Sequence, residues 1–302
     1  MSASLVDRLQ QSFPSLEFKS EFSLATVTYM KTGGLAEIYV IVSEIDQLTG
    51  LVRWLQSEKI RWYVLGGASN ILVPDSGLKG VVIQNRSAGF NISWESENIA
   101  TIQVESGHLT GLFVRKTIDH SLTGAEVFLG VPGTIGGAIY NNSHYMEQLI
   151  SEILITVTYL DEHGQVIESP VNELAFGYDT SIFHTRSCVI LSGKFQLKKG
   201  DPAEIQANML EATKKRASTQ PLGEPSSGCM FKNHLQSDGS LLSVGKIIDE
   251  LGLKGEQVGG AVVRDIHANF ILNNGSAKTT DVLQLAEKIE QKGFAGRGIK
   301  LE

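Results

Sequence analysis

The stretch from Val64 to Val73 constrains the fold more than any other part of the chain. It reads Val-Leu-Gly-Gly-Ala-Ser-Asn-Ile-Leu-Val, so an apolar run enters a glycine turn and a second apolar run leaves it. Glycines reach positive φ and carry no Cβ to hold a ligand away, while serine and asparagine add hydrogen-bonding groups to the exposed amides. Such a turn can hold a pyrophosphate. By spacing alone, a tight connection between two secondary-structure elements explains it equally well.

A second glycine cluster lies between Phe128 and Asn142 and reads Phe-Leu-Gly-Val-Pro-Gly-Thr-Ile-Gly-Gly-Ala-Ile-Tyr-Asn-Asn. Four glycines recur among apolar residues, and Pro132 fixes one φ. Two such loops in one domain predict an extended ligand. Neither loop matches the dinucleotide fingerprint G-x-G-x-x-G or the phosphate loop G-x-x-x-x-G-K-[ST], which disfavours an ordinary Rossmann or P-loop site.

Length, charge and cysteine content exclude several classes of protein. A chain of 302 residues is long enough for two or three domains with a sizeable core. A net charge of -7 argues against nucleic acid or an anionic membrane as partner. The two cysteines, Cys188 and Cys229, are too few for a disulfide framework and lack zinc-site spacing. With neither a signal-peptide pattern nor a run long enough to cross a bilayer, we expect a soluble cytoplasmic protein.

Periodicity and turn residues predict a mixed α+β chain with much antiparallel pairing. The first half predicts a short N-terminal helix, a strand over 36–42, and strands over 80–84 and 99–104. Between the first two strands we expect a helix capped by Ser43 in which Leu48, Leu51, Val52 and Leu55 share one face. A helix over 109–118, a hairpin over 157–167, and strands over 189–191 and 194–197 follow. Asp201-Pro202 begins a helix that runs to about Ser218. Beyond a polar loop over 220–228, we expect a helix over 244–251, a strand over 268–272 and a last helix capped by Thr280.

The ordered set of motifs resembles a known family. Val-Leu-Gly-Gly-Ala-Ser-Asn-Ile-Leu-Val, Val-Pro-Gly-Thr-Ile-Gly-Gly-Ala, Phe-Gly-Tyr at 176–178, Pro-Ser-Ser-Gly-Cys-Met-Phe-Lys-Asn at 225–233 and His-Ala-Asn-Phe-Ile at 267–271 look like MurB, UDP-N-acetylenolpyruvoylglucosamine reductase, of the type lacking an extra substrate loop. The likeness covers nearly the whole chain. It implies a p-cresol methylhydroxylase-type FAD-binding fold, with two FAD-binding subdomains over about 1–80 and 81–198 and a C-terminal substrate-binding domain over 199–302.

The resemblance implies that FAD is the cofactor and NADPH the hydride donor. The residues it assigns to FAD lie in three segments: Thr32, Gly33, Gly66, Gly67, Ala68, Ser69, Asn70, Pro132, Gly133, Gly136 and Gly137. The candidates for binding the substrate are Arg216, Lys232, Asn233 and His267. Each has an alternative interpretation, since a solvated helix end or a hydrogen-bonded structural histidine would leave the same pattern. None of the histidines shows metal-ligand spacing, so we expect no catalytic metal.

Cys229 stands where the family motif carries a serine that protonates the substrate. A thiol has a reference pKa of about 8.5, so it is mostly protonated at neutral pH and yields its proton far more readily than a hydroxyl. Cysteine is therefore a chemically sensible general acid at this position. The alternative is a buried, inert thiol that only fills space.

Two positions depart from the family pattern. The motif Phe-Gly-Tyr-Arg reads Phe-Gly-Tyr-Asp here, so Asp179 replaces an arginine that polarises the substrate carboxylate. A carboxylate would repel that group, and Arg186 is a candidate substitute for the lost charge. Tyr178 keeps its place as a candidate catalytic residue. The family's terminal glutamate would fall just beyond the last residue. Either Glu302 is the catalytic carboxylate by a shift in register, or the sequence stops short of that glutamate, or the role is lost.

These observations predict an FAD-dependent reductase that converts a UDP-sugar enolpyruvyl ether to UDP-N-acetylmuramate. Two alternatives stay open: a flavin oxidoreductase of the same fold with another substrate, and a flavoprotein that no longer turns over, for which Asp179 is the argument. The only partner expected is the small-molecule substrate, with no nucleic acid and no membrane, and the chain is expected to be a monomer or weak oligomer.

Overall fold

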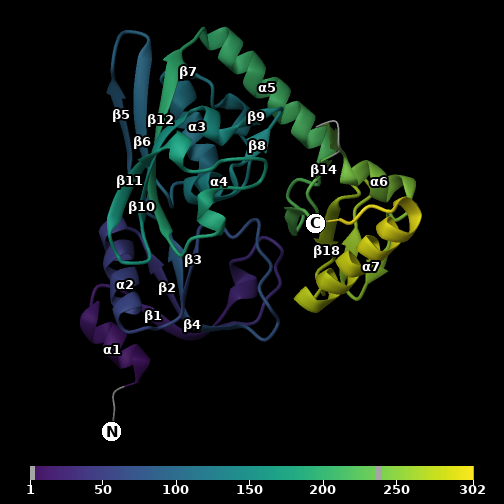
Figure 1. Cartoon of the computed structure of the whole chain (residues 1–302), viewed down its shortest axis with the longest axis horizontal. Helices are drawn as coiled ribbons and strands as arrows, with labels where there is room; N and C mark the ends of the chain where they lie inside the picture. The colour runs from purple at the N-terminus through teal and green to yellow at the C-terminus, as the bar shows by residue number, and fades with distance from the viewer. Residues whose placement is uncertain (1–3, 236–239, 302) are drawn as a thin grey trace. The chain divides into compact units, whose positions relative to one another are not determined.

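A computed structural model of the chain describes residues 4–235 and 240–301 (Figure 1). The chain divides into two compact units. Unit 1 falls within Met1–Phe22, Ala36–Gly67 and Lys79–Lys215. Unit 2 falls within Ser23–Leu35, Ala68–Leu78 and Arg216–Glu302. Two short segments from the first 80 residues thus belong with the C-terminal unit, although the chain around them builds unit 1.

The first sheet of unit 1 has the order β1-β2-β4-β3, with bounds β1 Phe18–Ser23, β2 Leu35–Val42, β3 Trp62–Leu65 and β4 Leu78–Asn85. Strands β3 and β4 are parallel, and the described residues between them in the chain form no helix; the helix α2 (Ile45–Ser57) connects β2 to β3. The predicted stripe on α2 is confirmed: Leu48, Leu51, Val52 and Leu55 are all buried. The predicted cap is off by one residue, because Glu44 occupies the N-cap position in place of Ser43.

The second sheet of unit 1 is antiparallel, with the order β11-β10-β12-β6-β5 and β7 paired to β12. Its strands are β5 Phe90–Trp94, β6 Ile99–Glu105, β7 Leu122–Thr123, β10 Leu154–Leu160, β11 Val166–Pro170 and β12 Val189–Lys199. The two strands predicted over 189–191 and 194–197 are one continuous strand. Gly193 lies at the expected break because a Cβ there would come within 2.8 Å of the Ile139 side chain.

Three helices accompany this sheet: α3 Thr110–Asp119, α4 Ile135–Asn141 and α5 Pro202–Thr219. The predicted start of α5 is confirmed, since the carboxylate of Asp201 accepts a hydrogen bond of 2.7 Å from the amide of Ala203. The sequence did not reveal α4, because two glycines in seven residues are unfavourable for a helix in isolation. Packing of the buried Ile135 and Ile139 stabilises it.

Unit 2 contains an antiparallel sheet of order β13-β18-β17-β16. Its elements are β13 Ser226–Cys229, β16 Gln257–Val258, β17 Ala261–Val263 and β18 Phe270–Asn273, with helices α6 Val244–Glu250 and α7 Thr279–Arg297. The predicted polar loop over 220–228 therefore ends in a strand, with Ser226 and Ser227 buried. Thr280 is not the cap of the last helix: it lies inside α7, and Lys278 precedes it at the N-cap position.

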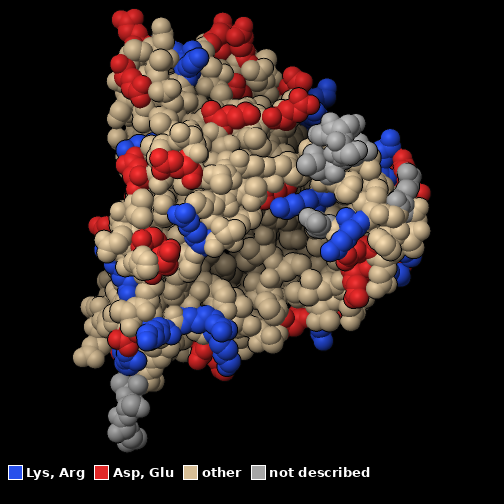
Figure 2. Space-filling view, in the orientation of Figure 1, with Lys and Arg blue, Asp and Glu red and all other residues tan. Residues whose placement is uncertain are grey.

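The described residues also form an N-terminal helix, short 3-10 turns and two small ribbons. These are α1 Leu5–Ser12, η1 Leu24–Thr26, η2 Glu126–Phe128, η3 Ile150–Glu152, η4 Val171–Glu173, η5 Ile182–His184, β8 His144–Tyr145 with β9 Gln148–Leu149, and β14 His234–Leu235 with β15 Leu241–Leu242. No helix among the described residues is apolar for long enough to cross a membrane. In Figure 2 acidic groups gather at the top of the view, where unit 1 carries β5 and the start of α5.

Candidate functional site

The two glycine clusters meet in unit 1. A Cβ on Gly67 would lie 2.7 Å from the Cα of Gly133, and a Cβ on Gly66 would lie 2.2 Å from Oγ1 of Thr134. Neither distance leaves room for a side chain, so glycine is required by the approach of one backbone to the other. The structure therefore brings together two loops that the sequence could only suggest as neighbours.

Backbone hydrogen bonds hold the second loop against the residues after β6. The amide of Thr110 donates to the carbonyl of Gly133 (3.1 Å), and the amides of Ile135 and Gly136 donate to the carbonyls of His108 (2.9 Å) and Ser106 (2.8 Å). A Cβ on Gly136 would approach Cβ of Ser106 to 2.9 Å. The loop is thus fixed on both sides before it enters α4.

Polar groups without partners line this junction. The hydroxyl oxygens of Thr134 and Thr110 are buried and make no hydrogen bond with any described residue. The nearest atom to a Cβ on Gly137 would be Oγ1 of Thr134, at 3.9 Å. Buried polar groups are normally paired, so the two orphaned hydroxyls beside these glycines mark a candidate ligand site. Hydroxyls in a glycine-rich loop fit the oxygens of a dinucleotide pyrophosphate.

The first loop continues into unit 2 at Ala68. Ala68 has a φ of 49°, a left-handed conformation uncommon for a residue with a side chain, and its carbonyl accepts a hydrogen bond of 3.0 Å from the amide of Tyr29. Further along the loop, the side-chain oxygen of Asn70 is 3.8 Å from the position of a Cβ on Gly228. Within unit 2, this loop therefore lies beside the strand that ends at Cys229.

Cys229 is exposed at the end of β13. Gly228 before it has a φ of 85°, and the pairing of β13 with β18 shifts register between Ser226 and Cys229. The two residues after the cysteine are hydrogen-bonded to Asn269. The amide of Met230 donates to the carbonyl of Asn269 (2.7 Å), the amide of Phe231 donates to its side-chain oxygen (3.0 Å), and its side-chain nitrogen donates to the carbonyl of Phe231 (2.8 Å). The thiol is therefore accessible on a firmly held backbone, which is what a proton donor needs.

The predicted substrate-binding residues all lie in unit 2. Arg216 is 6 % exposed and donates to Oε1 of Gln220 at 2.9 Å, and its Nε has no partner among the described residues. The side-chain oxygen of Asn233 accepts from the amide of Val244 at 3.2 Å. Lys232 is exposed.

His267 is held as a hydrogen-bond acceptor. The amide of Asn269 donates to its Nδ1 at 3.3 Å, and its ring lies edge-on to Phe270 with centroids 4.9 Å apart. Burial lowers the pKa of His267, and Lys254 adds to that effect. The ring is therefore neutral at pH 7, and with Nδ1 accepting, Nε2 carries the proton.

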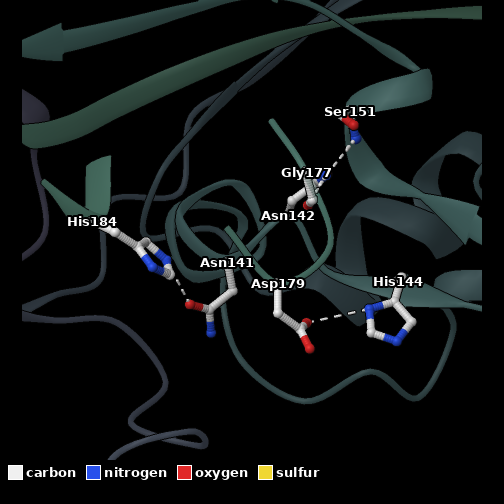
Figure 3. A network of polar contacts seen from close by, with 7 residues as sticks. All are labelled: Asn141, Asn142, His144, Ser151, Gly177, Asp179 and His184. Atoms are coloured by element: carbon white, nitrogen blue, oxygen red, sulfur yellow. Dashed lines mark hydrogen bonds and ion pairs between the residues drawn. The ribbon is translucent and has the colours of Figure 1, made fainter. Parts of the chain in front are cut away.

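Asp179 contacts a histidine, a pairing that the sequence did not reveal. Its carboxylate lies 3.3 Å from Nδ1 of His144 (Figure 3), and the imidazole ring is 4.9 Å from the ring of Tyr178. The backbone around the pair is also held: the side chain of Asn142 donates to the carbonyl of Gly177 at 2.9 Å and accepts from the amide of Ser151 at 3.1 Å. No signal in the sequence connects positions 144 and 179.

Arg186, the candidate substitute for the arginine, lines a cavity of about 510 Å³ in unit 1. His184 and Tyr140 line the same cavity and stack with centroids 4.4 Å apart. His184 also contacts the side-chain oxygen of Asn141 at 3.2 Å (Figure 3). Cys188 also lines this cavity. Burial raises the pKa of its thiol to about 11, and the negative charge of Glu162 raises it further.

The remaining predicted residues are placed as follows. Thr32 is buried and Gly33 has a φ of 118° beside Val73 in unit 2. Glu302 lies outside the described residues. Within 4–235 and 240–301, no cluster of three or more His, Cys, Asp or Glu residues is arranged to hold a metal ion. The orphaned hydroxyls of Thr110 and Thr134 were missed, although Thr134 lies inside the second glycine motif.

Fold and site together define a protein of the FAD-binding class. Residues 36–169, which include the Gly66–Gly67 turn and the Gly133 loop, match the FAD binding domain family. This match confirms the expected α+β flavin-binding fold. Residues 220–302 match the UDP-N-acetylenolpyruvoylglucosamine reductase C-terminal domain.

Individual relatives agree with both matches. The UDP-N-acetylenolpyruvoylglucosamine reductase of Trichormus variabilis is 35% identical over 277 residues, which cover 91% of this chain and 82% of the relative. That of Caldanaerobacter subterraneus subsp. tengcongensis is 33% identical over 301 residues, with 100% and 97% covered. The crystal structure of MurB from Thermus caldophilus superposes with a TM-score of 0.79 at 29% identity, covering 95% of this chain and 96% of the other. The chain belongs to the MurB family.

Proposed function

We propose that this chain is an FAD-dependent UDP-N-acetylenolpyruvoylglucosamine reductase. One observation carries the proposal: the glycine turn at 66–67 and the loop at 133–137 meet beside the unpaired, buried hydroxyls of Thr110 and Thr134, in a chain whose family carries this name. FAD held there would supply hydride, taken from NADPH, to the enolpyruvyl double bond, and the addition of one proton would complete UDP-N-acetylmuramate.

The residues that would hold FAD are Thr32, Gly33, Gly66, Gly67, Ala68, Ser69, Asn70, Pro132, Gly133, Gly136 and Gly137. The close approach of Gly66 and Gly67 to Gly133 and Thr134 supports the assignment of these two loops, since it leaves no room for side chains at the turn and the amides of such turns can bind a pyrophosphate. The division into an FAD-binding region over 1–198, with subdomains meeting near residue 80, and a substrate-binding domain over 199–302 remains part of this proposal.

Cys229 would donate the proton. Cys229 is exposed, and hydrogen bonds between Asn269 and Phe231 hold the backbone that follows it. A positioned general acid typically increases the rate by about 10²–10⁴-fold. Tyr178 and Glu302 complete the proposed catalytic set.

Arg216, Lys232, Asn233 and His267 would bind the UDP-sugar. The structure supports specific donors for two of them: Nε2–H of His267, because Nδ1 accepts from Asn269, and the amide nitrogen of Asn233, because its oxygen accepts from Val244. Arg216 and Lys232 would contribute positive charge toward the diphosphate or carboxylate.

Asp179 favours a second candidate: a MurB-like flavoprotein with impaired turnover, or one with another substrate. Its carboxylate replaces the family arginine and is paired with His144. A visible spectrum of the purified protein, followed by anaerobic reduction with NADPH and mixing with the enolpyruvyl substrate, tests the choice. Rapid substrate-dependent reoxidation with formation of UDP-N-acetylmuramate supports the reductase. Reoxidation only after oxygen is admitted supports the second candidate, and a protein that binds no flavin contradicts both.

We also propose a cytoplasmic monomer or weak oligomer that acts on a small molecule, with neither nucleic acid nor membrane as partner. The net charge of -7 and a content of only two cysteines, too few for a disulfide framework, support this. Light scattering of the holoprotein at several concentrations tests the oligomeric state.

A further inference from the structure

Three segments distant in sequence meet around one hydroxyl in unit 2. Oγ1 of Thr279, at the first residue of α7, lies 2.6 Å from the carbonyl oxygen of Val73 and 2.9 Å from Oγ1 of Thr32. Thr32 and Thr279 are almost completely buried. This hydroxyl joins the segments 28–34 and 68–78. These segments contain Gly33, Ser69 and Asn70, which are proposed to hold FAD.

The direction of these bonds follows from counting protons. Thr279 has one hydroxyl proton, and the carbonyl of Val73 can only accept it. The bond between the two threonines must therefore be donated by Thr32. Both hydroxyls are then used in a single chain that runs from Thr32 through Thr279 to Val73, and both are needed to keep it intact.

A second link joins the same helix to the same loop. The carboxylate of Asp75 accepts from the amides of Thr279 and Thr280, each at 2.9 Å, and from the hydroxyl of Thr280. Asp75 thus caps a helix that begins 204 residues later in the chain. Lys278 at the N-cap position makes no side-chain cap hydrogen bond, and the carboxylate of Asp281 accepts from the amide of Lys278 at 2.9 Å. The carboxylate of Asp75 also matches the partial positive charge of the helix N-terminus.

The two segments are also tied directly to each other. The amide of Gly34 donates to the carbonyl of Pro74 at 2.9 Å, and a Cβ on Gly33 would approach Cβ of Val73 to 2.8 Å. The side chain of Asn273, six residues before α7, donates to the carbonyl of Met30 at 2.9 Å. The three segments therefore form one hydrogen-bonded assembly around Thr279.

We propose that Thr279 is a positioning residue for the flavin: it holds the 28–34 and 68–78 segments in their binding conformation before FAD arrives. This inference rests on the FAD binding of the proposed function and adds a role for the C-terminal helix in it. Loops that are already ordered lose no conformational entropy when they bind a ligand. If only a fraction of the protein has the binding conformation, the apparent affinity is reduced by that fraction.

The test compares the FAD affinity of three apoproteins, measured by quenching of flavin fluorescence. Thr279→Val keeps the shape but removes the hydroxyl, and we expect a dissociation constant roughly tenfold higher, the scale of one buried hydrogen bond. Thr279→Ser restores the hydroxyl and should bind within about twofold of the wild type. Thr49→Val is the matched control, because it removes a buried hydroxyl that bonds only to a carbonyl of its own helix, that of Ile45 at 2.8 Å.

The outcomes separate the possible failures. If Thr279→Val lowers the melting temperature but binds FAD like the wild type, the residue is merely structural and the inference is wrong. If Thr279→Val does not fold, Asp75→Asn, at an exposed position, must weaken FAD binding in the same direction, and unchanged affinity overturns the inference. A wild-type apoprotein that takes up no FAD overturns the proposed function, and the inference with it.

Discussion

The carboxylate of Asp179 lies 3.3 Å from Nδ1 of His144, and the backbone of Asp179 has a φ of 49°. Asp179 is thus held against a histidine whose ring centroid is 4.9 Å from that of Tyr178. A substitution of Asp179 therefore also changes the surroundings of His144.

Asp179→Arg should raise kcat/KM for the enolpyruvyl substrate roughly tenfold or more, because it exchanges repulsion of a carboxylate for attraction. NADPH-dependent reduction of the flavin should not change. Steady-state kinetics with each substrate varied separately provides the measurement, and His144→Ala is the control that breaks the pair without adding a cation. If Asp179→Arg leaves kcat/KM where it was, this position does not face the substrate carboxylate.

Cys229→Ala should lower product formation by about 10²–10⁴-fold, since it removes the proposed proton donor. FAD binding and reduction by NADPH should persist, and Cys229→Ser should recover part of the rate because a hydroxyl is a weaker acid in the same place. Stopped-flow reoxidation with the enolpyruvyl substrate separates the steps. Cys188→Ala is the matched control, and turnover undiminished in Cys229→Ala would remove the thiol from the mechanism.

The two thiols should differ in reactivity toward iodoacetamide. Burial raises the pKa of Cys188 to about 11, so hardly any thiolate is present at pH 8, whereas Cys229 is exposed. We expect alkylation of Cys229 alone at pH 8, and labelling of Cys188 only as the pH approaches 11. Mass spectrometry of the labelled peptides measures the alkylation of each cysteine. Equal labelling of the two cysteines at pH 8 would contradict the raised pKa of Cys188.

Gly67→Ala should weaken FAD binding roughly tenfold or more, because a Cβ 2.7 Å from the Cα of Gly133 forces the two loops apart. Gly111→Ala is the control: it lies in α3 with no atom within 4 Å of the new Cβ, so it should raise stability by up to about 1 kcal/mol. Fluorescence titration with FAD and urea unfolding measure the two effects. Equal FAD affinity in both variants would show that the loop junction is not the flavin site.

Asp75 should make the stability of the chain sensitive to acid. Burial alone would raise the pKa of Asp75, but hydrogen bonds from the hydroxyl and amide of Thr280 and from the amide of Thr279 lower it below 3.8. A carboxyl whose folded pKa is depressed stabilises the fold above its unfolded pKa and loses that contribution as the pH falls through the folded value. The wild type should therefore lose stability below pH 3.8 more steeply than Asp75→Asn. Parallel urea melts between pH 5 and pH 2.5 check this, and identical slopes would exclude the linkage.

Local signals predicted much of the fold and part of the site. The buried stripe of α2, the Asp201-Pro202 start of α5 and the hairpin of β10 and β11 follow from spacing, capping and turn residues within about ten positions of one another. Both glycine loops and Cys229 were recognised because each lies in a motif of consecutive residues. Such features depend on neighbours along the chain, which a sequence displays directly.

Only the tertiary structure decided which distant residues meet. Gly193 continues β12 because Ile139 packs over it. Asp75, from a distant segment, caps α7. His144 contacts Asp179, 35 positions further along the chain, and nothing in the sequence links these two residues. The sequence alone determined two glycine-rich loops and a thiol next to a polar loop; that the thiol ends a strand, β13, was decided by the structure. Their assembly, with Gly67 against Gly133 and Asn70 beside Gly228, required the packed backbone, because contacts between distant segments depend on the whole path of the chain between them.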